Sequence, residues 1–150
     1  MVGNKPLKCD SGTERKEFVP QYHQTVVANE FLNSNKRGVL FYHSLGSGKT
    51  CAAYMAVDIY RKTKGKRPVY ILAPASLASS HKHQYCNICG EDKIAFNNEF
   101  KFYSYNDRAG IAKRLPANLN DSIIIIDEVQ EVVNGKSNNS ASLVERCALH

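Results

Sequence analysis

An apolar run of four residues, Val39–Tyr42, leads within a few positions into a glycine-rich turn and then into an alanine-rich stretch. The short run is typical of a strand, and Cys51–Tyr60 is typical of a buried helix. Between them, Gly46 and Gly48 lack a Cβ, so successive backbone N–H groups can close around an anion. A strand, a glycine-rich turn and a helix in this order predict an α/β fold with a phosphate-binding loop.

The turn ends in Lys49 and Thr50, and both residue types suit a nucleotide. Lys49 supplies a point charge for the β and γ phosphates, and Thr50 offers a hydroxyl to Mg²⁺ at the start of a helix. The expected cofactors are therefore ATP and Mg²⁺, and the expected nucleotide-binding residues of the turn are Ser44, Leu45, Gly46, Ser47, Gly48, Lys49 and Thr50. The full signature G-x-x-x-x-G-K-[ST] would have glycine at position 43, where this chain has His43. A glycine turn that binds nothing is the alternative.

Four consecutive isoleucines, Ile123–Ile126, precede Asp127 and Glu128. The run is too short for a membrane span and is typical of a strand buried in a parallel sheet. Ligands of open α/β sheets lie beyond the carboxyl ends of the strands. Asp127 is therefore expected in the Mg²⁺ shell, and Glu128 is expected to orient and deprotonate the water that attacks the γ-phosphate, with Lys49 as the other catalytic residue. The alternative is a pair of acids at a helix N-terminus.

Together, Gly46–Thr50 and Asp127–Gln130 resemble motifs I and II of superfamily 2 helicases, the DEAD/DEAH-like ATPases. The resemblance implies a RecA-like P-loop NTPase lobe with a mostly parallel sheet. It also implies ATP binding and hydrolysis coupled to translocation on, or unwinding of, DNA or RNA. Gln130 would contact the nucleotide, although the histidine usual in DEAH-like members is absent there.

Two further segments take their roles from the resemblance. Gln24, with Gln21 as a weaker candidate, would read the adenine, and its alternative is an exposed polar residue on the helix that follows. Pro74, Ala75 and Ser76 would touch the nucleic-acid backbone as motif Ia. Their alternative is an ordinary strand-to-helix turn with Ser76 as a helix cap.

The residue sequences of these motifs are closer still to one branch of the family. Phe41–Thr50, Ala73–Leu77, Cys89–Gly90 and Phe102–Asn106 are similar to transcription-associated helicases of large cytoplasmic DNA viruses. In that setting His43 is expected. This similarity implies viral transcription machinery as a partner, and the host cytoplasm or the virion as the location.

Length limits the expected domain content. The chain has 150 residues, which suits one domain, whereas a helicase motor of this family uses two lobes. Residues 1–17 form a polar lead, and residues 18–150 are expected to be the N-terminal part of the ATP-binding lobe, incomplete at its C-terminus. Motif III and the second lobe do not appear before His150. A truncated nucleotide- or nucleic-acid-binding module without turnover is therefore the alternative function.

Composition favours a polyanion partner. The net charge is +6 with a pI near 9.1, and no apolar leader precedes the first elements, so an intracellular protein without a membrane contact is expected. The densest basic run, Arg61–Arg67, would join a helix to the next strand at the edge of the sheet away from the ligand. We therefore interpret it as a solvated loop and not as a nucleic-acid patch.

Five cysteines in an intracellular chain favour free thiols or metal ligands over disulfides. His81, His83, Cys86 and Cys89 are zinc-type ligands, but their spacing is tight and no second C-x-x-C follows, so zinc is not favoured over two histidines capping an exposed helix. The remaining expected elements are helices at Thr25–Asn33 and near Asp107–Lys113, strands at the start of Val69–Leu77 and at Glu99–Tyr105 and Ser122–Asp127, a loop at Asn134–Ser140, and a last helix capped by Ser140 or Ser142.

Overall fold

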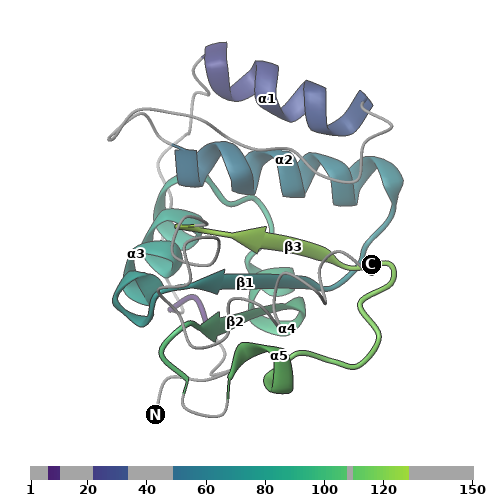
Figure 1. Cartoon of the computed structure of the whole chain (residues 1–150). Helices are drawn as coiled ribbons and strands as arrows, with labels where there is room; N and C mark the ends of the chain where they lie inside the picture. Colours follow the sequence, from purple (N-terminus) through teal and green to yellow (C-terminus); the bar gives the residue numbers. More distant parts are fainter. Residues whose placement is uncertain (1–6, 11–21, 34–48, 108–109, 129–150) are drawn as a thin grey trace. The chain divides into compact units, whose positions relative to one another are not determined.

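The computed structural model describes residues 7–10, 22–33, 49–107 and 110–128 (Figure 1). The chain divides into two compact units, and each is described by itself. Unit 1 comprises residues 1–7, 67–79 and 96–150, and unit 2 comprises residues 8–66 and 80–95. The strand expected at Val39–Tyr42, the loop expected at Asn134–Ser140 and the cap expected at Ser140 or Ser142 lie outside the described residues.

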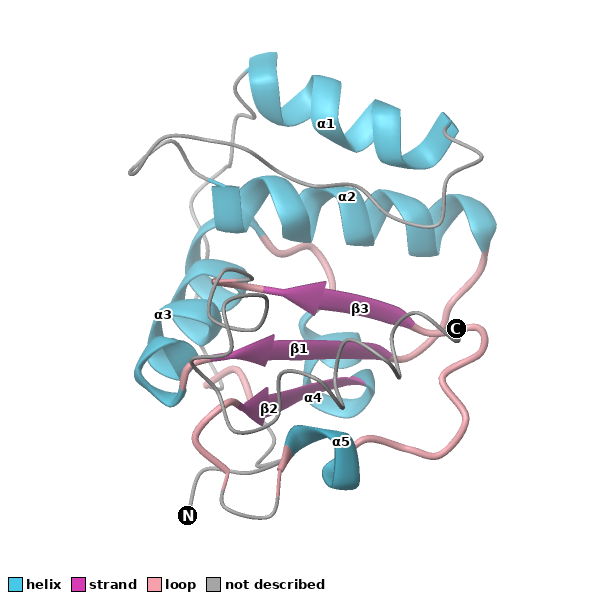
Figure 2. Ribbon diagram, in the orientation of Figure 1, coloured by secondary structure: helices cyan, strands magenta, loops and turns pink. Residues whose placement is uncertain are grey.

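Unit 1 contains a parallel sheet whose described strands have the order β2-β1-β3 (Figure 2). Val69 pairs with Phe100 on one side and with Ile123 on the other, so the three strands run in one direction. This arrangement confirms the predicted α/β class, and the strand predictions at Glu99–Tyr105 and Ser122–Asp127 differ from the structure by one residue at each end. The strands are β1 (Val69–Ala73), β2 (Phe100–Ser104) and β3 (Ile123–Ile126).

A core cluster covers one face of this sheet. Side chains alternate across a strand, so Tyr70 and Leu72 share one face of β1 while Ile71 lies on the other. The cluster consists of Tyr70, Leu72, Tyr103, Tyr105, Ile111, Leu115 and Leu119, with Ile124 and Ile126 packed against it.

Strand β3 is less buried than its composition predicts. Ile123 is 7% exposed, whereas Ile124, Ile125 and Ile126 are only partly buried. Among the described strands β3 pairs with β1 alone, so one edge of β3 has no described neighbour. A continuous isoleucine run is typical of a strand covered on both faces, and the described residues give that cover only to Ile123.

The helix expected near Asp107–Lys113 is shorter in the structure. Helix α5 spans Ile111–Arg114 and follows Gly110, whose φ of 92° lies in the left-handed region that favours glycine. Because that conformation interrupts a helix, Asp107 lies outside α5. The carboxylate of Asp107 instead accepts a hydrogen bond from the Nε of Arg114 at 3.1 Å.

Unit 2 is built on two helices that pack against each other, α1 (Tyr22–Asn33) and α2 (Lys49–Lys64). Helix α1 begins three residues before the expected Thr25, and α2 confirms and extends the helix expected at Cys51–Tyr60. The small side chains of α2 allow close packing, and its buried residues include Cys51, Ala52, Tyr54, Ala56 and Val57. Gly65 ends the helix with a φ of 112°, donating its N–H to the carbonyl of Arg61 at 3.2 Å.

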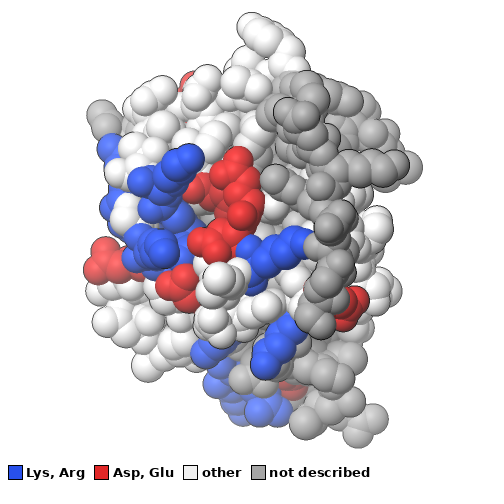
Figure 3. Space-filling model, turned by 180° about the vertical axis from the view of Figure 1, so that it is seen from behind, with Lys and Arg blue, Asp and Glu red and all other residues white. Residues whose placement is uncertain are grey.

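Basic side chains are exposed where α2 ends. Arg61, Lys62 and Lys64 lie in the last turn of α2, and the loop predicted at Arg61–Arg67 begins only at Gly65. Lys62, Lys64 and Lys66 are exposed, as the prediction of a solvated segment requires, whereas Arg61 is only 5% exposed. Figure 3 shows both basic and acidic side chains exposed on the face that it presents.

A helical segment connects the two units in sequence and ends against α2 in unit 2. It runs through the 3-10 turn η1 (Ala75–Leu77), helix α3 (Ala78–His83) and the π-helical turn η2 (Gln84–Cys89), and helix α4 (Lys93–Glu99) follows after a short connection. The hydroxyl of Tyr85 donates to Asp58 Oδ1 of α2 at 2.8 Å and accepts the N–H of Asp92 at 3.1 Å. Asp58 Oδ2 accepts the N–H of Glu91 at 3.1 Å. Asp58 therefore fastens the residues after η2 to α2.

Burial changes the acidity of this pair. It raises the pKa of Asp58 from 3.8 to about 6; the charge of Glu91 adds to the rise, while the hydrogen bonds from Tyr85 and from the Glu91 N–H and the charge of Arg61 oppose it. Burial, followed by the charge of Asp58, also raises the pKa of Tyr85 above its ordinary value.

Within the described ranges, no helix combines the length and the apolar character that a bilayer crossing requires.

Gly90 is expected to tolerate no side chain. A Cβ at this position would collide with the ring and the carbonyl oxygen of Tyr85, which is fully buried. We predict that Gly90→Ala lowers the free energy of unfolding by about 1–3 kcal/mol, because overpacking forces neighbours out of place. Urea unfolding measures the change, and Lys66→Ala, at an exposed position, serves as the control. A loss in Gly90→Ala no larger than in the control would contradict this packing.

The stability of unit 2 is expected to depend on pH through Asp58, which is only 8% exposed. Its folded pKa of about 6 exceeds the ordinary value of 3.8, so between these pH values the folded form holds a proton that the unfolded form has released. The free energy of unfolding should therefore fall as pH rises through this window, by up to about 3 kcal/mol. Urea midpoints across the window measure the fall, and Asp58→Asn should flatten it. An equal slope in Asp58→Asn would assign the effect to other groups.

Candidate functional site

Strand β3 ends in the two acids that the sequence singled out. The N–H of Asp127 donates to the carbonyl of Leu72 at 2.8 Å, which extends the pairing with β1 to this residue. The N–H of Glu128 donates to Asp127 Oδ1 at 2.9 Å. Glu128 has a φ of 55°, a left-handed conformation that is uncommon for a residue with a long side chain. The chain therefore turns sharply at the carboxyl end of β3, with both acids at this edge of the sheet.

Strand β1 ends at the same edge. Pro74 follows it directly, η1 begins at Ala75, and Ser76 is exposed. The N–H of Leu77 donates to the carbonyl of Pro74 at 3.0 Å, so a tight turn leads from strand to helix. This geometry is that of the alternative, an ordinary strand-to-helix turn at Pro74–Ser76. Pro74 is the N-cap of η1 and no side chain caps it, so Ser76, which lies inside η1, is not its cap. The role of these residues toward nucleic acid stays a prediction.

Strand β2 contributes the third turn of this edge. The N–H of Tyr105 donates to the carbonyl of Ala73 at 3.0 Å. Asn106 Oδ1 accepts the N–H of Ala75 at 2.9 Å, and the hydroxyl of Tyr105 donates to the carbonyl of Asp127 at 2.8 Å. The sequence alone did not single out Tyr105 and Asn106 for a role. The only sequence feature that pointed to them was the similarity of Phe102–Asn106 to transcription-associated viral helicases.

The nucleotide-binding residues expected in unit 2 are described only in part. Helix α2 begins at Lys49, and Thr50 is partly buried in its first turn. Ser44, Leu45, Gly46, Ser47 and Gly48 lie outside the described residues, as do Gln21 and Gln130. Lys49 and Thr50 belong to unit 2 and Asp127 and Glu128 to unit 1, so their approach to a common ligand stays a prediction.

Gln24 lies within α1 and is 3% exposed. The alternative interpretation, an exposed polar residue on this helix, is therefore wrong. A buried amide requires hydrogen-bond partners, which makes this position more constrained than a solvated surface glutamine. Its role toward the adenine is still a prediction.

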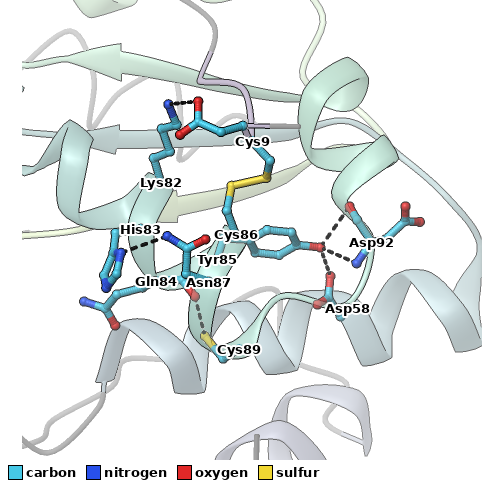
Figure 4. The surroundings of a disulfide bond; sticks show 11 residues. Cys9, Asp58, Lys82, His83, Gln84, Tyr85, Cys86, Asn87, Cys89 and Asp92 are labelled. Atoms are coloured by element: carbon cyan, nitrogen blue, oxygen red, sulfur yellow. Dashed lines mark hydrogen bonds and ion pairs between the residues drawn. A yellow bond between two sulfur atoms is a disulfide. The ribbon is translucent and has the colours of Figure 1, made fainter. Parts of the chain in front are cut away.

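Four of the five cysteines form disulfides, so the expectation of free thiols or metal ligands is wrong for them. Cys9 bonds Cys86 (Figure 4), and Cys51 bonds Cys89. The Cα–Cα distances are 5.4 and 5.8 Å, within the range that a disulfide spans. The partners lie 77 and 38 residues apart in sequence, so only the fold of unit 2 brings them together. The bond from Cys51 fixes the first turn of α2, one residue after Thr50.

The histidines of the same segment also have partners. His81 is 2% exposed, and its Nδ1 lies 2.7 Å from the hydroxyl of Tyr54, so the interpretation of an exposed helix cap is wrong for this residue. His83 is exposed and bonds Asn87 at 2.9 Å. In the described part of the chain, no group of three or more His, Cys, Asp or Glu side chains has the arrangement of a metal site.

Magnesium needs fewer protein ligands than such a cluster provides. It takes oxygen ligands, keeps several waters, and commonly uses one or two protein groups together with substrate phosphates. The carboxylate of Asp127 and the hydroxyl of Thr50 are donors of this class. The donor types therefore fit Mg²⁺, and the absence of a three-residue cluster among the described residues does not bear on it.

Comparison with known proteins gives two findings. The family model described as the res subunit of type III restriction enzymes (ResIII) matches residues 17–146. The protein "Putative ATP-dependent RNA helicase R563" of Acanthamoeba polyphaga mimivirus is 26% identical over an aligned length of 146 residues. The match covers 77% of this chain and 25% of that protein. The chain thus spans about a quarter of the length of this curated relative. No solved structure matches. Both findings agree with the resemblance to superfamily 2 helicases.

The disulfides make unit 2 sensitive to reduction. Peptide mapping under non-reducing conditions should recover the pairs Cys9–Cys86 and Cys51–Cys89. Loss of the Cys51–Cys89 bond, measured by urea unfolding of Cys89→Ser, should cost about 4 kcal/mol by loop-closure entropy for a 38-residue separation. Cys147→Ser should leave both pairs intact. Recovery of a Cys86–Cys89 pair, or of four alkylated thiols without reductant, would contradict the pairing.

Proposed function

This chain belongs to the ResIII family, and on that premise we propose that it binds and hydrolyses ATP, coupled to movement on nucleic acid, as the leading part of a superfamily 2 helicase. The observation that carries the proposal is the shared edge of the sheet in unit 1. There, Asp127 and Glu128 follow β3 directly, beside the turn at Pro74–Ser76 that follows β1.

We further propose that residues 18–150 are the N-terminal part of the ATP-binding lobe, with motif III and a second lobe in a longer protein. The coverage of the mimivirus relative, of which the chain spans a quarter, supports this division. An arginine finger from a second lobe would be worth about 10³ to 10⁵ in rate in related phosphoryl-transfer enzymes. The isolated chain should therefore turn over slowly at best.

The proposed roles follow from the chemistry of each side chain. The Lys49 ammonium would stabilise charge on the β and γ phosphates, and the backbone N–H groups of Ser44–Gly48 would surround them. Thr50 and Asp127 would hold Mg²⁺, which when bound neutralises phosphate charge. The Glu128 carboxylate accepts a proton from the attacking water, and Gln24 and Gln130 would contact the nucleotide.

Pro74, Ala75 and Ser76 are the proposed contacts to the nucleic-acid backbone. The name of the mimivirus relative specifies RNA, so RNA is the first substrate to test, with DNA of the same sequence beside it. Viral transcription machinery is the partner that the residue sequences of the motifs favour. An alternative function is a module that binds nucleotide or nucleic acid without turnover, and single-turnover hydrolysis in the longest natural product separates the two.

Two substitutions test the assigned roles. Lys49→Ala should weaken nucleotide binding by about 10- to 100-fold, because a charged hydrogen-bonding group is lost. Glu128→Gln should bind ATP normally and lose about 10²- to 10⁴-fold in hydrolysis, because the amide cannot accept the proton. Fluorescent-nucleotide titration and phosphate release measure the two effects.

Lys62→Ala is the matched control, since Lys62 lies on α2 but is exposed near its other end. If Lys49→Ala binds ATP as tightly as the parent, the assignment of the phosphate loop fails. If Glu128→Gln retains full hydrolysis, another residue is the base.

A further inference from the structure

Tyr105 hydrogen-bonds to the ends of two other strands. It follows β2, its N–H donates to the carbonyl of Ala73 at the end of β1, and its hydroxyl donates to the carbonyl of Asp127 after β3. Because β1 lies between β2 and β3, this side chain reaches past the end of the central strand.

The bond from Tyr105 acts on the peptide between the two acids. Its hydroxyl holds the carbonyl of that peptide at 2.8 Å, and the carboxylate of Asp127 holds the N–H of the same peptide at 2.9 Å. With both polar groups bonded, the peptide plane has little freedom to rotate. Glu128 follows this peptide in its uncommon left-handed conformation, so the orientation of the plane sets the direction in which the Glu128 side chain leaves the backbone.

The next residue, Asn106, fastens the other turn. Its Oδ1 accepts the N–H of Ala75 at 2.9 Å and lies 3.4 Å from the Ser104 hydroxyl, which itself accepts the N–H of Asn106 at 2.9 Å. A backbone N–H can only donate, so the amide oxygen must face Ala75. Two adjacent residues thus hold the turn at Pro74–Ser76 and the turn at Asp127–Glu128.

The Tyr105 half of the path between the two turns is buried, whereas Asn106 is exposed and is held by its hydrogen bonds. Tyr105 is 7% exposed and belongs to the core cluster with Tyr103, Leu72 and Ile111. Packed cores resist small continuous deformation and respond by discrete shifts. A displacement of Ala75 by a bound phosphate backbone would therefore reach Asp127 through Asn106 and Tyr105.

We propose that Tyr105 is a positioning residue that couples a phosphodiester backbone bound at Pro74–Ser76 to the catalytic pair Asp127–Glu128. This inference rests on the proposed function and adds to it the route by which the two ligands affect each other. Coupling between two ligands is reciprocal, so it is measurable from binding alone and needs no turnover.

The test uses Tyr105→Phe in the longest natural product of the gene, because this change removes the hydroxyl and keeps the ring. The measured quantity is the ratio of dissociation constants for a labelled oligouridine with and without Mg²⁺ and a non-hydrolysable ATP analogue. A ratio different from one is expected in the parent. Tyr105→Phe should bring it closer to one by about two- to tenfold, the worth of one hydrogen bond. Each ligand alone should bind with an unchanged constant.

Tyr103→Phe is the matched control, since it removes a hydroxyl from the same cluster that does not bond Asp127. A second pair of variants tests the other end at an exposed position. Asn106→Leu removes the acceptor for Ala75 and should lower the coupling, whereas Asn106→Asp keeps an acceptor and should retain the ratio.

Three results would overturn the proposal: an unchanged ratio in Tyr105→Phe together with Asn106→Leu, an equal loss in Tyr103→Phe, or a parent ratio of one despite binding of both ligands. A purely structural role would lower the unfolding midpoint and both affinities together while leaving the ratio intact. A parent chain that binds no nucleotide would instead contradict the proposed function, and the inference would fall with it.

Discussion

Parallel pairing of β1 with both β2 and β3 is the constraint on which the candidate site of unit 1 depends. All five residues of β1 are buried, and the register aligns Val69 with the first residues of both neighbours. Strands in such register end at one edge, so turns from distant parts of the sequence meet there. Four hydrogen bonds then join the turns, those of Asp127 N–H, Tyr105 N–H, Tyr105 hydroxyl and Asn106 Oδ1.

Much of this edge follows from local sequence. A run of apolar β-branched or aromatic residues specifies each strand, and polar or turn residues end it, so Val69–Ala73 and Ile123–Ile126 could be predicted closely. The role of Tyr105 could not be predicted in this way. Its hydrogen bonds depend on the strand order β2-β1-β3, which the local sequence pattern does not encode. The left-handed φ of Glu128 is equally hidden, since nothing in the residue type favours it.

In unit 2, the sequence-based predictions for the four paired cysteines, and of exposed positions for Gln24 and His81, are wrong because each depends on which residues the fold brings together. Compartment arguments treated the cysteines as an intracellular set, but pairing is decided by Cα separation in the folded chain. The burial of Gln24 and His81 likewise depends on packing that periodicity alone does not determine. The outcome matters for function, because the Cys51–Cys89 bond lies in the first turn of α2, beside the residues assigned to phosphate and Mg²⁺. The family match across residues 17–146 includes residues of both units.

Hydrogen exchange of the backbone amides, with Mg²⁺ and an ATP analogue and then with oligouridine, tests the central claim most directly. The account predicts that nucleotide slows exchange at Ser44–Cys51 and at Asp127–Glu128, and that RNA slows it at Ala75–Leu77 and Tyr105–Asn106. Protection by nucleotide confined to segments other than these two, or protection by RNA confined to Lys62–Lys66, would contradict it.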